Sequence, residues 1–157
     1  MTPRIAGFVW GTAALLLDQA SKAITLAAGS GDSTWAIQVT PFFNLILVRN
    51  DGVSFGLLGG HIPWWALSMF ALVVIAYLLW WLWREASWIT SAGLGLIIGG
   101  AVGNVLDRYR HGAVTDFLDF HAFGWHWPAF NLADVAIFAG VAYILWDGIH
   151  PRSQERM

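Results

Sequence analysis

The sequence predicts an all-α polytopic membrane protein with four transmembrane helices and a small extracytoplasmic β element. Of its 157 residues, 57% are hydrophobic and only 11% are charged, whereas soluble domains are roughly 45–50% apolar and about 25% charged. Four apolar stretches, each about as long as the 20 residues that cross a bilayer, take up roughly half of the chain. Between the first two lie β-prone runs, which predict the β element.

Composition also limits what the protein can do. The chain has room for one membrane-embedded domain, residues 1–157, and none for a separate soluble enzyme domain. Its formal net charge is −2, which argues against a nucleic-acid partner. It contains no cysteine, and this excludes disulfides, thiolate catalysis and cysteine-bound metals.

The first predicted span, residues 5–28, is interrupted by polar side chains. Asp18 and Lys22 are four positions apart, so one helix face carries both and they can form a structural ion pair. A basic start followed by an apolar run is also typical of a cleaved signal peptide, but such peptides stay apolar where this chain has Asp18 and Lys22. We therefore expect a retained helix.

Residues 29–61 are predicted to form the first outer loop. Two β-prone runs, residues 34–40 and 42–48, are separated by Pro41, a residue that interrupts strands. Just after them come Asn50 and Gly52. These two residues either form a simple turn, in which both types are common, or belong to a binding loop, where the Asn50 amide can donate and accept hydrogen bonds.

The second and third predicted spans, residues 62–83 and 88–106, are joined by a short polar link. The second contains no charge, and its tryptophans cluster at both ends, about 25 Å apart along a helix. This arrangement is typical of the aromatic belts at the two membrane surfaces. The third contains Gly99 and Gly103, and glycines four residues apart let another helix approach closely.

The fourth predicted span is residues 131–149, and Pro151 ends it. Residues 107–130 are expected to form the second outer loop. Four spans place both termini on the same side of the membrane. The basic residues are divided too evenly for the positive-inside rule to decide alone, and we expect both termini in the cytoplasm.

Polar residues gather at the predicted membrane edges, although a charge at the bilayer centre costs about 2.5–3.5 kcal/mol. Asn104, Asp107 and Arg108 share one helix face. They either satisfy the carbonyls at a helix end or form a site in which Arg108 braces a carboxylate. Asn131 and Asp134 fit the start of the last helix as cap and third residue. Asp134 is also a functional candidate because its span is otherwise apolar.

Asp116 and Asp134 together suggest a carboxylate pair, although their spacing does not prove that they meet. Two neighbouring carboxylates share a proton, because both cannot ionise cheaply. The ionised one can take a proton from water and the protonated one can donate to a carbonyl oxygen, which is general acid–base hydrolysis. The five histidines show no HExxH spacing for zinc, and no serine has a GxSxG setting.

At these residues the chain resembles the lipoprotein signal peptidase family, the type II signal peptidases of bacteria. The resemblance covers essentially the whole chain in order, spacing and four-span layout. The motifs that carry it are Asp18-Gln19-x-Ser21-Lys22, Asn50-x-Gly52-x-Ser54-Phe55, Gly99-Gly100-Ala101-x-Gly103-Asn104-x-x-Asp107-Arg108-x-x-x-Gly112-x-Val114-x-Asp116-Phe117-Leu118-Asp119-Phe120 and Phe130-Asn131-Leu132-Ala133-Asp134-x-Ala136-Ile137.

The resemblance implies an aspartic endopeptidase of the bacterial inner membrane, active as a single chain and without metal or cofactor. Its substrate would be a prolipoprotein with a diacylglyceryl-modified cysteine, cut just before that cysteine near the periplasmic face, and its inhibitor would be globomycin. Membrane lipids would be its other partners. Asp116 and Asp134 would be the catalytic residues. The expected substrate-binding residues are Asn50, Gly52, Asn104, Arg108 and Asn131. The expected structural supports are Asp18, Lys22 and Asp107.

Two other functions remain open from the residues alone. A small proton-coupled transporter could use Asp18 and Asp134 as a proton relay, although the sequence shows no inverted repeat. A metal-dependent enzyme acting on lipid headgroups could hold Mg²⁺ with Asp107, Asp116 and Asp119.

Overall fold

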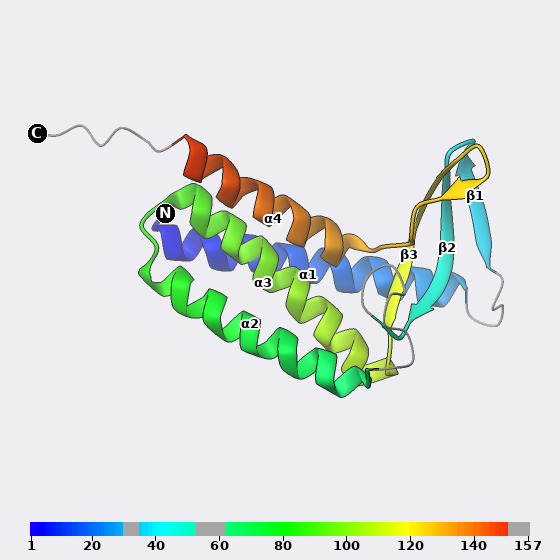
Figure 1. The fold of residues 1–157 in the computed structure, drawn as a ribbon, viewed down its shortest axis with the longest axis horizontal. Helices are drawn as coiled ribbons and strands as arrows, with labels where there is room; N and C mark the ends of the chain where they lie inside the picture. The colour runs from blue at the N-terminus through cyan, green and yellow to red at the C-terminus, as the bar shows by residue number, and fades with distance from the viewer. Residues whose placement is uncertain (30–34, 53–61, 151–157) are drawn as a thin grey trace, which may run out of the picture.

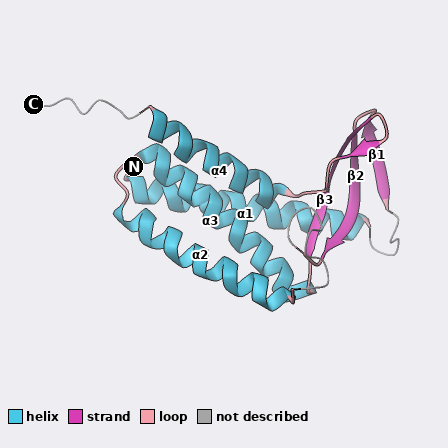
Figure 2. Cartoon of the chain, in the orientation of Figure 1, coloured by secondary structure: helices cyan, strands magenta, loops and turns pink. Residues whose placement is uncertain are grey.

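The computed structural model describes residues 1–29, 35–52 and 62–150, which form a bundle of helices with a small sheet at one end (Figures 1 and 2). The helices are α1 (Pro3–Ala28), α2 (Trp64–Arg84), α3 (Trp88–His111) and α4 (Leu132–Ile149). The strands are β1 (Ala36–Thr40), β2 (Phe43–Asn50), β3 (Val114–Ala122) and β4 (Trp125–His126). The predicted mostly helical architecture with a small β element is confirmed.

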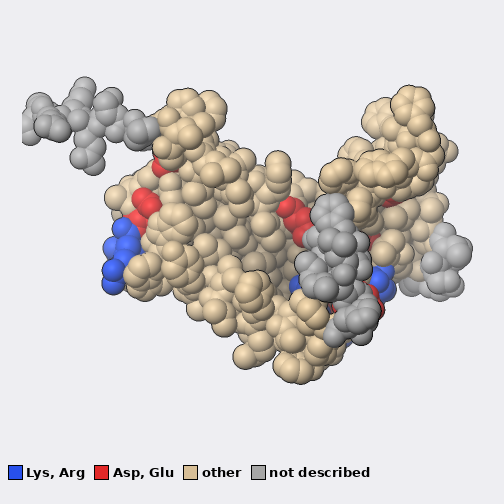
Figure 3. Space-filling view, in the orientation of Figure 1, with Lys and Arg blue, Asp and Glu red and all other residues tan. Residues whose placement is uncertain are grey.

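Among the described residues, three helices, α2, α3 and α4, are long and apolar enough to cross a membrane. Helix α1 has 26 residues, but the polar stretch that includes Asp18 and Lys22 makes it less apolar than the others. On the visible face, Lys, Arg, Asp and Glu gather toward the two ends of the bundle and leave the surface between them uncharged (Figure 3). That distribution suits a bundle whose middle lies in hydrocarbon.

Helix α3 is the central element of the bundle and packs against α1, α2 and α4. It meets α2 through aliphatic side chains, with Leu78, Leu82 and Leu94 forming the buried cluster. It meets α1 and α4 through glycines. At Gly99 an added methyl group would overlap the backbone carbonyl of Gly11 in α1, so the close approach that the glycine spacing predicted does occur there.

We expect Gly99→Ala to destabilise the bundle, because the new methyl group must push α1 and α3 apart. Overpacking of this kind typically costs about 1–3 kcal/mol. Gly148→Ala in α4 is a matched control, since a methyl group there meets no atom within 4 Å and alanine favours helix by about 1 kcal/mol over glycine. Thermal unfolding in detergent should show a lower melting temperature for Gly99→Ala only. Equal melting temperatures would contradict the tight packing.

The sheet is antiparallel with the strand order β1-β2-β3-β4. The two runs on either side of Pro41 form β1 and β2, as predicted. Residues 107–130, which the sequence predicted as the second outer loop, contain regular structure that the sequence did not indicate, since α3 continues to His111 and the rest supplies β3 and β4. Asp116 and Asp119 obscure the alternation of apolar and polar residues by which β3 could have been recognised in the sequence. Helix α3 ends at Gly112, which has a positive φ of 72°.

Pairing of β3 with β2 brings the loop sequence back to the bundle. Asp116 lies opposite Val48, and Val114 lies opposite Asn50. The first residues of β3 are buried between the sheet and the ends of α1 and α3. The sheet therefore places Asp116 at the end of the bundle where α4 begins.

Candidate active site

Asp116 lies in β3 with only 2% of its surface exposed, and both of its carboxylate oxygens accept hydrogen bonds from amides. The side chain of Asn50, at the end of β2, donates to Oδ2 at 2.9 Å. The side chain of Asn131 donates to Oδ1 at 2.6 Å. Two donors on one carboxylate favour its ionised form.

Asp134 lies in the first turn of α4 and is tied to Asn131 by a capping box. The Asn131 side chain accepts a hydrogen bond from the Asp134 backbone at 3.1 Å, and the Asp134 side chain accepts one from the Asn131 backbone at 3.3 Å. Asn131 is fully buried. Because this one residue contacts both Asp116 and Asp134, the structure brings the two acids together, which the sequence spacing alone did not establish.

Asn104 and Lys22 form a second layer behind Asp134. The Asn104 side chain donates to Asp134 Oδ1 at 3.0 Å. The ammonium of Lys22, in α1, donates to Asn104 Oδ1 at 2.9 Å. Lys22 is 2% exposed, and its ammonium lies 2.9 Å from Asp18 and 3.4 Å from Asp107. A buried cation is therefore connected to Asp134 through one amide.

The three asparagine amides in this site have their oxygens occupied by donors. The donor to each oxygen is different: the backbone amide of Gly52 donates to Asn50, the backbone amide of Asp134 donates to Asn131, and Lys22 donates to Asn104. An amide whose oxygen accepts must present its NH₂ group on the other side. The surrounding structure therefore fixes all three amides so that they donate to Asp116 or Asp134.

Asp18 and Asp107 hold secondary-structure elements in place around Lys22. Asp18 accepts a hydrogen bond from the backbone amide of Ala133 in α4 at 3.0 Å. Asp107 accepts one from the backbone amide of Thr115 in β3 at 2.8 Å. Asp18 thereby connects α1 with α4 at the residue before Asp134. Asp107 connects α3 with β3 at the residue before Asp116.

Arg108 lies at the edge of this site and reaches toward the end of β2. Its guanidinium donates to the backbone carbonyl of Gly52 at 3.3 Å and to that of Asn104 at 3.5 Å. The sequence left two roles open, satisfying backbone carbonyls and bracing a carboxylate, and these two contacts are with carbonyls. Gly52 is therefore placed near the site through its backbone, while residues 53–61, which include part of the Asn50 motif, lie outside the described residues.

Burial raises the pKa of Asp116 to about 6. This value is the net result of several causes: the neighbouring Asp134 charge also raises the pKa, whereas the hydrogen bonds from Asn50 and Asn131 and the charge of Lys22 lower it. A carboxyl group with a pKa near 6 can gain or lose a proton under physiological conditions, as general acid–base catalysis requires.

Beside Asp134 lies an apolar cavity of about 360 Å³. Its lining comes from the segment between β4 and α4 and from the first turns of α4, and it consists of Trp127, Pro128, Ala129, Phe130, Asp134, Val135 and Phe138. No site role was predicted from the sequence for the aromatic residues of this wall. Trp127 and Phe138 flank the motif that runs from Phe130 to Ile137, and this position was the signal that could have indicated them.

Asp119 does not join the site. It hydrogen-bonds within the sheet to Asn44, at 2.8 Å, and to His126, whose Nδ1 lies 2.8 Å from its nearer oxygen. Burial alone would raise the pKa of Asp119, but these hydrogen bonds hold it below its usual value. Within the described ranges no three His, Asp or Glu side chains group as metal ligands, so the geometry does not support a Mg²⁺ site made with Asp119.

Comparison with known proteins gives a consistent result. Residues 11–150 match the family profile described as signal peptidase (SPase) II. The lipoprotein signal peptidase of Nitrobacter hamburgensis is 44% identical over 153 residues, which cover 94% of this chain and 93% of that protein. That of Rhodopseudomonas palustris strain CGA009 is 43% identical over 155 residues, with 95% and 94% covered. A solved bacterial membrane enzyme matches with a TM-score of 0.79 and 26% identity, over 96% of this chain and 94% of that one.

Proposed function

This chain belongs to the signal peptidase II family, and from that premise we propose that it is an aspartic endopeptidase. It removes the signal peptide from prolipoproteins and cuts just before a diacylglyceryl-modified cysteine. The observation that carries the proposal is the contact of Asn131 with both Asp116 and Asp134, because hydrolysis by two carboxyl groups needs them around one water molecule and one peptide carbonyl.

In the first step Asp116 is the base and Asp134 holds the shared proton. Asp116 takes a proton from water, and the water oxygen bonds to the carbonyl carbon of the scissile peptide. Asp134 gives its proton to the carbonyl oxygen, which produces a neutral tetrahedral intermediate. Each carboxylate accepts two hydrogen bonds, Asp116 from Asn50 and Asn131 and Asp134 from Asn104 and Asn131, so the pH profile of cleavage distinguishes this assignment from the reverse one.

In the second step the intermediate collapses. The peptide nitrogen takes the proton from Asp116 and the C–N bond breaks. One hydroxyl of the intermediate returns its proton to Asp134 as the new carboxylic acid forms. Both aspartates then have their starting protonation, so the pair is ready for another cycle.

The residues around the pair bind the substrate in this proposal. The amides of Asn50, Asn104 and Asn131 position the carboxylates. The partly exposed Asn50 and Asn104 face the substrate backbone, while the buried Asn131 and Gly52 support the site from behind. Arg108 orients a substrate carbonyl, because a guanidinium has five N–H donors and its two described hydrogen bonds use backbone carbonyls. The apolar cavity beside Asp134 suits a lipid-modified, hydrophobic substrate.

We place the site near the periplasmic face of the inner membrane, with four spanning helices and both termini in the cytoplasm. Helix α1 can span although it is less apolar, because the charged residues beyond its first turn face inward: Asp18 is fully buried and paired with Lys22. The residues that α1 exposes include Leu16, Leu17 and Ile24, each more than 60% exposed. A helix with this pattern presents an apolar surface to lipid.

Cleavage of a synthetic prolipoprotein peptide tests the function. Purified protein in detergent should cut a peptide with a diacylglyceryl-modified cysteine on the amino side of that cysteine, as read by mass spectrometry. The same peptide without the lipid should be cut slowly or not at all. Globomycin should inhibit the reaction and a metal chelator should leave it unchanged. Failure to cut the lipidated peptide, combined with proton flux in liposomes, would favour a transporter.

The pH dependence of cleavage follows from the pKa of Asp116, which is about 6. Because Asp116 must be ionised to act as the base, kcat/KM should rise as pH increases through about 6 and should be low at pH 5. The measurement is kcat/KM against pH with the lipidated peptide. An activity that instead falls as pH rises through 6 would exchange the roles of the two aspartates.

A further inference from the structure

The far end of the sheet carries exposed aromatic side chains that the proposed chemistry does not use. Phe42 lies in the turn between β1 and β2, Phe123 in the turn between β3 and β4, and Trp125 in β4. Their exposed fractions are 57%, 108% and 61%. We call these three residues the aromatic tip. Exposed aromatic residues gathered in this way mark an interaction surface more often than single exposed apolar residues do.

The turn at the aromatic tip has a sequence that its backbone conformation does not favour. Phe123 has a φ of 53° and Gly124 a φ of 79°, so both residues of this two-residue hairpin turn are left-handed. Turns of this type favour Asn-Gly or Asp-Gly, because a bulky side chain resists positive φ. A phenylalanine held there against its preference, with its ring in the open, points to a use for the ring.

The surface next to the aromatic tip is apolar and leads toward the active site. A shallow hollow of about 420 Å³ lies along it, and its lining is Phe42, Phe120, His121, Ala122, Trp125, Trp127 and Phe130. None of these seven residues is Asp, Glu, Lys or Arg. Trp127 and Phe130 also line the cavity beside Asp134. One apolar surface thus runs from α4 to the aromatic tip.

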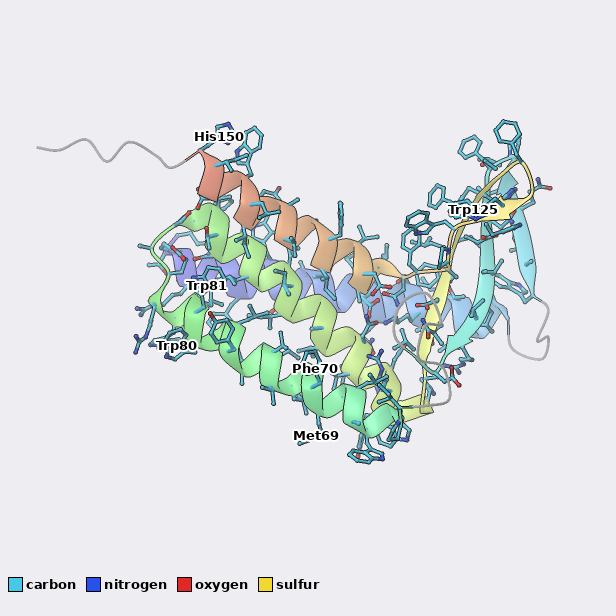
Figure 4. All side chains as sticks on the ribbon, in the orientation of Figure 1. Met69, Phe70, Trp80, Trp81, Trp125 and His150 are labelled. Atoms are coloured by element: carbon cyan, nitrogen blue, oxygen red, sulfur yellow. The ribbon has the colours of Figure 1, made fainter. Side chains whose placement is uncertain are left out.

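The position of the sheet indicates what covers this surface. The sheet reaches beyond the bundle on the side of α4, and side chains near Trp125 gather on the side of the sheet that faces the helices (Figures 1 and 4). Helix α4 exposes Phe138, Val141 and Leu145 along a segment apolar enough to cross a membrane. The lipid layer that covers these α4 residues must therefore have its surface next to the part of the sheet that reaches beyond the bundle.

We propose that the aromatic tip inserts into the interfacial layer of the membrane beside α4 and holds the sheet against the lipid surface. Tryptophan and phenylalanine suit this layer, where an apolar ring meets water and headgroups. The inference rests on the proposed function only in that α4 crosses a membrane. It gives the sheet a second role besides positioning Asp116, namely to keep the apolar surface between α4 and the aromatic tip at a fixed depth in the membrane.

Site-directed spin labelling tests the insertion, and a chain without cysteine suits it. Single cysteines at Phe123, at Gln38 in β1 and at Phe70 in α2 each receive a nitroxide, and each protein is reconstituted at one copy per phosphatidylcholine nanodisc. Accessibility to oxygen and to a water-soluble nickel chelate then reports the depth of each label. The label at 123 should be more accessible to oxygen and less accessible to nickel than the aqueous reference at 38. Its depth should lie between those of the references at 38 and 70.

A second pair of labelled proteins tests the role of the phenylalanine ring. Phe123→Asn suits the left-handed turn, so the hairpin should still form, but it removes the apolar ring. A label at Trp125→Cys should therefore move toward the aqueous reference when Phe123→Asn is added. No cleavage assay enters this experiment, so a loss of enzyme function would not affect it.

Three results would overturn the proposal. The first is a label at 123 that is as accessible to nickel as the label at 38. The second is a label shielded from both reagents, which would indicate a protein partner. The third is spin–spin broadening at 123 that appears when a parallel preparation holds two copies per nanodisc, which would indicate a second copy of this chain. A label at 70 exposed to nickel would instead contradict the membrane placement of the bundle itself.

Discussion

Replacing either Asp116 or Asp134 with asparagine should reduce cleavage of the lipidated peptide by at least about 10³-fold, near the upper part of the range for general acid–base catalysis. Asparagine keeps the shape of aspartate but cannot give up or accept the catalytic proton. Asp116→Asn removes the base that activates water, and Asp134→Asn removes the acid that protonates the carbonyl oxygen. The measurement is kcat with saturating peptide, alongside thermal unfolding of each variant.

Both variants should remain folded. Each loses one favourable hydrogen bond, because an NH₂ group replaces an oxygen that accepts from Asn50, Asn104 or Asn131, at about 1–3 kcal/mol. Neutralising Asp116 also removes the energetic penalty of burying a charge, which is the main reason why its pKa is raised. This second effect offsets part of the first.

Asp147→Asn is the matched control for Asp134→Asn. Asp147 lies near the other end of α4, where it accepts hydrogen bonds from Ser87 and Thr90, and asparagine still offers an oxygen to such donors. Its kcat should stay close to that of the unchanged chain. Substantial cleavage by Asp116→Asn or Asp134→Asn would remove the pair from the mechanism, whatever the family resemblance.

The sequence predicted the helices because they depend on local patterns. An uncharged run such as residues 62–83 must be buried in lipid or protein, and its length fits a helix, so α2 was expected almost as found. β3 was missed because Asp116 and Asp119 are held by partners from elsewhere in the chain. Without those partners the segment has the pattern of a polar loop.

The candidate residues were selected from motifs, but their geometry was not predictable from spacing. Five separate segments, α1, the end of β2, α3, β3 and the start of α4, contribute to the network around the two acids. The direction in which each asparagine amide points depends on donors outside its own motif, such as Lys22 for Asn104. Only the folded chain specifies that all three amides donate to the carboxylates.

Lys22→Met should unfold or strongly destabilise the protein. Lys22 is 2% exposed and lies between Asp18 and Asp107, which are 0% and 2% exposed. Methionine has a similar length but no charge, so two carboxylates would stay buried without their cation. Breaking a buried ion pair by removing one partner typically costs about 3–5 kcal/mol. Thermal unfolding in detergent measures this loss.

The double variant Asp18→Asn/Lys22→Met separates the structural role of Lys22 from its effect on chemistry. It removes one charge of each sign, and the asparagine that replaces Asp18 keeps an oxygen for the backbone amide of Ala133. We expect much of the lost stability to return. Asn104, however, then loses the 2.9 Å hydrogen bond from Lys22 and keeps only the longer one from Asn131, at 3.3 Å, to hold its amide toward Asp134. Since small misplacements of catalytic groups can reduce rates by about 10²-fold, kcat should stay well below that of the unchanged chain.

The pH profile of the double variant gives an independent readout. The Lys22 charge lowers the pKa of Asp116, which is about 6, so its removal should raise that pKa and move the acidic limb of kcat/KM to higher pH. A double variant with recovered stability, unchanged kcat and an unshifted acidic limb would show that Lys22 only neutralises Asp18. Recovered stability with a slow, shifted reaction would show that the buried cation also acts on the catalytic pair, through Asn104 and through its charge.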